Sequence, residues 1–240
     1  MVLAQPAAKS GQFLHGEISH SDSLPPVNDA SLQPGNVIDK CLLSPALANL
    51  DWHVIPEWYA GHWRVSEETI TSYRDYRTGQ DKTMFDKIRN EVDWLSGSEK
   101  DASGQIWNCK QVPYTSTVTL SNEIDYFHER KLDYLDVEAN KVVIQETGYQ
   151  INTDPESGRI ISVLQDEAIH SYVPINDGEM QENISKKVFD ATGQALFKRT
   201  VTRQVFRDKS FMPSSSLMSS FIEFLNAHGL RKLVPVAPTS

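Results

Sequence analysis

The sequence predicts a mainly β protein: a single antiparallel up-and-down β-barrel of about eight strands, with an irregular N-terminal arm and a C-terminal α-helix. Two observations carry this prediction. Between residues 61 and 206, apolar and polar residues alternate with the two-residue period of strands. The segments between these runs are short, polar and rich in Gly, Asn and Asp. They leave no room for helical crossovers, so they connect neighbouring antiparallel strands.

The composition is that of one globular domain. The chain has 240 residues, of which 39 % are hydrophobic and 23 % are charged, and all-β barrels of this length are commonly single domains. We expect residues 1–50 to form the arm and residues 51–240 to form the barrel domain with its helix. The net charge of −9 argues against a nucleic-acid partner, because phosphate repels an acidic surface. No apolar run approaches the roughly 18 residues that a transmembrane helix needs, so we expect no transmembrane segment.

The first 50 residues show little periodicity. Residues 1–36 are rich in Ser, Pro, Gly, Gln and Asn, which is typical of an arm on the domain surface or of disorder. Residues 37–50 are more apolar, and Pro45 limits them to one or two helical turns. The small residues near Met1 resemble the tract around a signal-peptide cleavage site, which favours an exported protein, periplasmic, lumenal or secreted.

From there the chain is a succession of predicted strands. The large aromatic residues Trp52, Trp58, Tyr59 and Trp63 come first, and they are expected in the core or at a barrel end because each ring removes much apolar area from water. The predicted strands span residues 63–73, 84–95, 105–112, 122–137, 141–152, 159–173, 179–189 and 195–206. The polar segment 96–104 is a predicted loop.

The last element has the period of a helix. Apolar residues recur at helical spacing from Leu217 to Leu225, and Gly229 ends the run. The serines at 214–216 offer an N-cap. The sequence therefore predicts an amphipathic helix over residues 214–229 that packs its aromatic face on the outside of the sheet.

The tripeptide Gly61-His62-Trp63 opens the first predicted strand. A Gly-x-Trp at this place, a meander of strands and a helix after it resemble the calycins, the superfamily of the lipocalins. The resemblance implies that Trp63 closes one barrel end beneath an arginine of the last strand, and of three candidates there we expect Arg203. It also implies that Gly61, Trp63 and Arg203 are structural residues.

Two histidines lie on predicted strands. His128 shares a strand face with Tyr126, and His170 shares one with Tyr172, so all four could line a cavity together with Tyr149. These five residues are the predicted ligand-binding candidates. The alternative is that the histidines are structural, hydrogen-bonded or facing solvent.

The sequence contains no recognisable catalytic motif and identifies no cofactor. No Gly-rich phosphate loop, nucleophile elbow or metal-binding pair is present, and the isolated Cys41 and Cys109 predict no zinc site. The two cysteines are either free thiols or one disulfide.

Three functions stay open. The first is binding of a small apolar molecule, such as a lipid, pigment or tetrapyrrole, in the barrel cavity. The second is an isomerase or cyclase that uses His128, His170, Tyr126 or Tyr149 as acid and base. The third is an accessory subunit of a larger assembly, docked through its arm or its helix.

Overall fold

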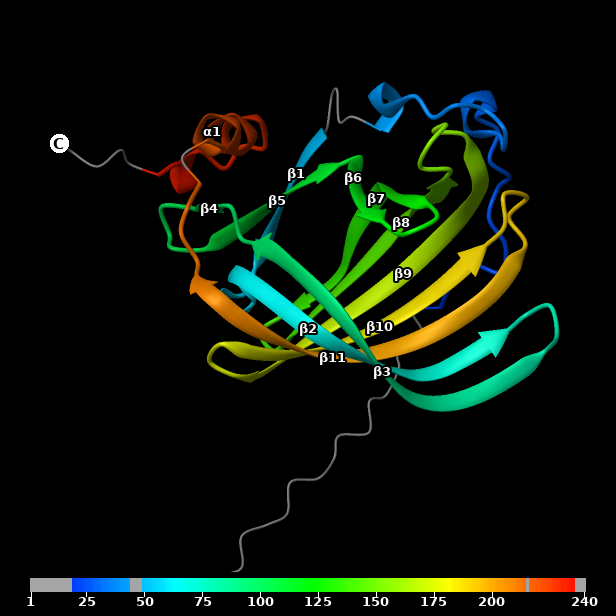
Figure 1. Ribbon diagram of the computed structural model, residues 1–240. Coiled ribbons are helices and arrows are strands. Elements are labelled where there is room, and N and C mark those ends of the chain that lie inside the picture. The colour runs from blue at the N-terminus through cyan, green and yellow to red at the C-terminus, as the bar shows by residue number, and fades with distance from the viewer. Residues whose placement is uncertain (1–18, 44–48, 215, 236–240) are drawn as a thin grey trace, which may run out of the picture.

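The computed structural model describes residues 19–43, 49–214 and 216–235, and its main feature is one curled antiparallel sheet of eight strands (Figure 1). The sheet forms a half-barrel, beside which lie a three-stranded sheet and one short helix. The predicted fold class, a mainly β protein with an eight-stranded up-and-down sheet and a C-terminal helix, is confirmed.

The large sheet follows a meander. Its strands are β2 (Gly61–Asp75), β3 (Gln80–Ser96), β6 (Tyr114–Thr119), β7 (Ile124–Glu138), β8 (Lys141–Thr153), β9 (Ile160–Asn176), β10 (Glu179–Phe189) and β11 (Ala195–Ser210). The order β3-β2-β11-β10-β9-β8-β7-β6 places the first long strand, β2, against the last, β11, and leaves β3 and β6 at the edges. The sequence did not reveal β6, because after Tyr114 its residues are only Thr, Ser and Val at a sheet edge and do not alternate regularly between polar and apolar.

Curling brings the inner side chains of distant strands together. The rings of Trp94 on β3 and Tyr172 on β9 lie 6.4 Å apart between centroids, although three strands separate β3 from β9. Both pack in a cluster with Trp63, Val65 and other buried apolar residues, which forms the core of the half-barrel. We call the face that carries Tyr172 the inner face.

The small sheet combines the predicted strand 105–112 with two segments that the sequence did not assign to strands. It has the order β1-β5-β4, with bounds β1 (Asn49–Ile55), β4 (Glu99–Lys100) and β5 (Ile106–Val112). Of the helical turns predicted in 37–50, the described residues contain η2 (Lys40–Leu43), and the predicted loop 96–104 contains β4. Residue Pro45 lies outside the described residues. The η3 turn (Glu57–Tyr59) then leads into β2.

Helix α1 (Met218–Ala227) packs on the small sheet. Its fully buried Phe221 and Leu225 contact Trp52 of β1 and Trp107 of β5. The predicted aromatic face is therefore present, but it covers the three-stranded sheet. The predicted serine N-cap is wrong: Leu217 occupies the N-cap and makes no side-chain cap hydrogen bond. The short η4 (Arg231–Leu233) follows.

The described part of the arm lies on the outer face of the large sheet. Its η1 turn (Ala30–Leu32) and η2 present apolar side chains to Tyr126, Ile151 and Val163. Backbone hydrogen bonds from Leu24 and Val27 to the β10–β11 turn fix its path. The arm therefore covers the outer face of the sheet over β7 to β10, and the core packs on the inner face. Residues 1–18, with the tract that favoured export, lie outside the described residues. Both cysteines are free thiols.

Candidate functional site

A chain of buried charged groups crosses the inner face, and His170 on β9 is at its centre. Its Nδ1 lies 2.7 Å from Glu182 Oε1 on β10, and its Nε2 lies 3.3 Å from Glu146 Oε2 on β8. The two carboxylates flank His170 because β8 and β10 pair with β9 on either side. Burial alone lowers the pKa of His170, but the two carboxylates outweigh burial and raise it to about 10. His170 is therefore an imidazolium at neutral pH.

The chain of charged groups continues from Glu182 to Arg203 on β11. Glu182 is fully buried and accepts hydrogen bonds from His170 and from Arg203 Nε. Burial raises the pKa of Glu182, but these two cations together bring it below its ordinary value. Arg203 Nη1 lies 3.7 Å from Glu68 on β2, which accepts a hydrogen bond from Asn90 on β3. Each buried charge thus has a partner, as the desolvation cost of several kcal/mol per ion requires.

The other end of this chain of charged groups holds a carboxyl group whose pKa is unusually high. Burial raises the pKa of Glu129 on β7 to about 7, and the charge of Glu146 adds to this shift. The pKa of Glu146 falls to about 2, because His170 outweighs the effect of burial. Glu129 therefore exchanges its proton near neutral pH beside a carboxylate that stays ionised.

A cavity of about 280 Å³ adjoins this chain of charges. Its lining includes Glu129, Glu146, His170 and Arg199, together with the Lys186 ammonium that pairs with Asp166. One buried nitrogen atom in the lining, Arg199 Nε, makes no hydrogen bond within the described residues, whereas His170 Nε2 faces its ion-pair partner Glu146. A buried N–H group without an acceptor is costly, so Arg199 Nε is suited to an acceptor atom of a ligand. No group of His, Cys, Asp and Glu in the described chain is arranged to hold a metal ion.

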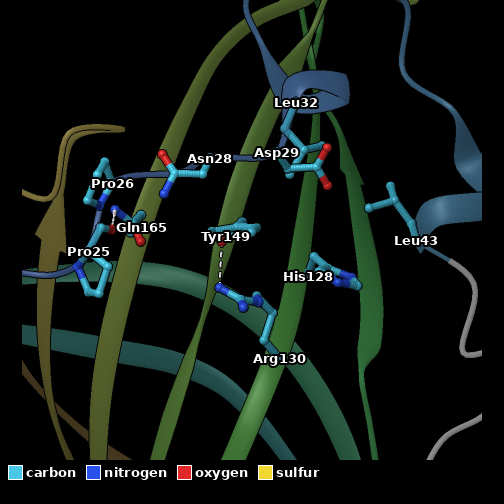
Figure 2. A pocket seen from close by; sticks show the side chains of 10 residues that line it. All are labelled: Pro25, Pro26, Asn28, Asp29, Leu32, Leu43, His128, Arg130, Tyr149 and Gln165. Carbon is cyan, nitrogen blue, oxygen red and sulfur yellow. Dashed lines mark hydrogen bonds between the residues drawn. The ribbon is translucent and has the colours of Figure 1, made fainter.

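A second pocket, of about 450 Å³, lies between the arm and the outer face (Figure 2). The arm contributes apolar side chains such as Pro25 and Leu32, and the sheet contributes His128, Arg130 and Tyr149. Arg130 Nη1 donates a hydrogen bond of 2.5 Å to the Tyr149 hydroxyl, and its guanidinium carbon lies 4.6 Å from the centre of the Tyr149 ring. This pocket has no ion pair across it in the described residues.

The structure divides the five predicted cavity residues between the two faces. His170 and Tyr172 lie on the inner face, where Tyr172 belongs to the core next to the charged chain. His128 and Tyr149 are cross-strand partners whose side chains lie in the outer pocket (Figure 2), although both also border the inner cavity. Tyr126 is buried under the arm. The histidines therefore do not converge on one site.

Sequence reasoning missed the acidic partners of His170. Glu182 stands between Met180 and Ile184 on the inner face, and all three are buried. Glu146 similarly follows Val142 and Ile144 on the inner face of β8. A carboxylate on an otherwise apolar face of a strand could have indicated these partners from the sequence, because a charge is rarely buried unless it is paired.

The predicted stack of Arg203 on Trp63 is wrong, because the guanidinium over Trp63 belongs to Arg207, at 4.8 Å from the ring centre. Arg207 is the direct cross-strand partner of Trp63, and irregular pairing of β11 with β2 moves Arg203 over Trp94 instead, at 5.7 Å. Gly61 has a φ of +144°, and a Cβ there would lie 2.9 Å from a carbonyl oxygen of β11. The close strand contact therefore requires glycine.

Comparisons with family models, with curated proteins and with solved structures give no match for this chain. None of the described helices has the length and apolar character needed to cross a membrane.

Proposed function

We propose that the protein binds a small polar molecule in the cavity of its inner face. One observation carries the proposal: the cavity is lined by ionised side chains, and one of its buried donors, Arg199 Nε, has no partner in the described residues. A ligand with an acceptor atom supplies the missing hydrogen bond.

The size and lining of the cavity favour a compact polar ligand over the apolar one expected from the sequence. Its volume of about 280 Å³ lies near the lower limit of ligand sites, which is roughly 300 Å³. A long lipid chain would also have to desolvate charged groups such as Glu146 and Lys186 without pairing them. The cavity also favours ligand binding over the accessory-subunit alternative, which needs no cavity.

The resemblance to the calycins also supports a binding function. The pair of Trp63 and Arg207 fits the arginine-capped tryptophan that the resemblance implies. The neighbouring positions of the first and last long strands fit a barrel-type carrier. The proposed class is therefore a calycin-type binding protein.

The test is native mass spectrometry of the full chain, followed by thermal shift with the small polar molecules that co-purify. The variant is Ala168→Leu, which adds bulk to the lining from β9. The control is Ala139→Leu, the same change in the exposed β7–β8 turn. We expect a bound molecule to raise the melting temperature of the wild type and of the control. Its affinity for Ala168→Leu should be at least tenfold lower than its affinity for the wild type. Equal binding by both variants, or no polar ligand at all, contradicts the proposal.

A second candidate is acid–base catalysis on the bound molecule, and the pKa of about 7 of Glu129 favours it. A carboxyl group that exchanges its proton near neutral pH, at the wall of a cavity, is suited to take a proton from a substrate and return it. The measurement is deuterium incorporation from D₂O into carbon positions of the bound molecule. Glu129→Gln should abolish incorporation and leave binding intact, and a wild type without incorporation excludes this candidate.

A further inference from the structure

The outer pocket is separate from the cavity of the proposed function. The arm forms one wall and the outer face of β7 and β8 forms the other, and the strand register puts this face opposite the one that carries His170. From its chemistry we infer that this pocket is a second ligand site, which takes a small organic anion with an apolar body.

The apolar half of the site comes from the arm. Pro25, Pro26 and Leu32 line the pocket (Figure 2), and the arm segment that carries them is fixed by a hydrogen bond of 2.8 Å from Val27 N to Ala191 O. A volume of about 450 Å³ holds a molecule of two or three rings. The wall is therefore both apolar and held in place.

The donor groups come from the sheet. Arg130 is exposed toward the pocket and has no carboxylate within ion-pair distance in the described chain; its one hydrogen bond goes to Tyr149. Tyr149 accepts that bond through its hydroxyl oxygen, so its own proton is available to a ligand. A guanidinium and a phenol side by side are a donor pair for a carboxylate or sulfonate.

His128 supplies a neutral group beside these donors. The hydroxyl of Thr115 donates its single proton to the Leu43 carbonyl at 2.7 Å, so it accepts the 2.9 Å hydrogen bond from His128 Nδ1. Burial and the nearby Arg130 lower the pKa of His128, which keeps the ring neutral at pH 7 with Nε2 unprotonated.

Asp29 is the one carboxylate in the lining, and it lies at the other end of the pocket from Arg130 (Figure 2). Its Oδ1 is engaged by the backbone and hydroxyl of Ser31. The pocket is therefore polarised, with its cation at the sheet and its anion at the arm, and a ligand's negative group fits only at the Arg130 end.

The test compares two fluorescent probes that differ in charge. 8-Anilinonaphthalene-1-sulfonate carries a sulfonate on the ring system that N-phenyl-1-naphthylamine presents uncharged. The variant is Arg130→Gln. The matched control is Arg74→Gln, which removes another arginine that lies over a tyrosine ring, that of Tyr76, far along the chain. Arg199→Gln serves as the control for the inner cavity.

We expect Arg130→Gln to weaken binding of the sulfonate probe about tenfold or more and to leave the uncharged probe unchanged. Arg74→Gln and Arg199→Gln should bind both probes like the wild type, and Arg130→Lys should fall between Arg130→Gln and the wild type. Three results would each overturn the inference: wild-type affinity of Arg130→Gln for the sulfonate, equal loss for both probes, or no binding of the sulfonate to the wild type.

Discussion

Glu182→Gln tests whether the chain of charges on the inner face is a stable, mutually paired unit. Glu182 is fully buried and joins His170 to Arg203. The amide has nearly the shape of the carboxylate but no charge. The substitution therefore leaves two buried cations beside a neutral group without opening a cavity.

The expected loss follows from the partners that remain. Removing one member of a buried ion pair costs about 3–5 kcal/mol. His170 keeps Glu146 at 3.3 Å and Arg203 keeps Glu68 at 3.7 Å, so the lower end applies, about 3 kcal/mol. For a chain of this size, each kcal/mol moves the melting temperature by roughly 2–4 °C, so the expected drop is roughly 6–12 °C.

The assay is urea unfolding at pH 7, followed by intrinsic tryptophan fluorescence, with a thermal melt as a second probe. Glu67→Gln is the control, because the ion pair of Glu67 with Lys87 is exposed and contributes little. Its unfolding midpoint should match that of the wild type. A loss of less than about 1 kcal/mol for Glu182→Gln refutes the reasoning, since it would mean that water or another group already satisfies the two cations.

Three further predictions concern the pH dependence, the helix and the arm. The pKa of His170 is about 10 in the folded protein and about 6.5 in the unfolded chain, so its stabilising effect is complete below pH 6.5 and is lost as the pH rises to about 10. His170→Gln should flatten this decline of the unfolding free energy with pH. A wild type whose unfolding free energy is constant over that interval contradicts the prediction. Phe221→Ala should cost about 3 kcal/mol and expose the tryptophans under α1 to a fluorescence quencher, and unchanged quenching would show that the helix packs without it. Gly193→Ala places a Cβ 1.7 Å from Leu24 O, so it should displace the arm and speed proteolysis near residues 20–27. The control is Gly79→Ala, whose Cβ meets nothing within 4 Å and which should leave the arm resistant to proteolysis. Equal cleavage rates for the two variants would refute the close contact.

Sequence periodicity predicted most strands of the large sheet, but it placed the candidate site poorly. Strand β9 explains why. It is buried on both faces, by the core on the inner side and by the arm on the outer side, so both sets of alternating residues contain apolar side chains. Alternation then groups residues by face without identifying the inner face, and His128 and His170 both remained cavity candidates. Only the register shows that His128 belongs with Tyr149 and Gln165 on the outer face.

The sequence by itself determined most of the long strands, the turns between them and the amphipathic helix, because these depend on residues near one another in the chain. It also placed Gly61 and Trp63 at the start of the first long strand. The tertiary structure alone decided the curl of the sheet, the second sheet beneath α1 and the arginine that covers Trp63. It likewise decided the partners of His170, since Glu146 and Glu182 reach it from neighbouring strands. Charges that are distant in sequence acquire partners and shifted pKa values only when pairing of the strands removes them from water together.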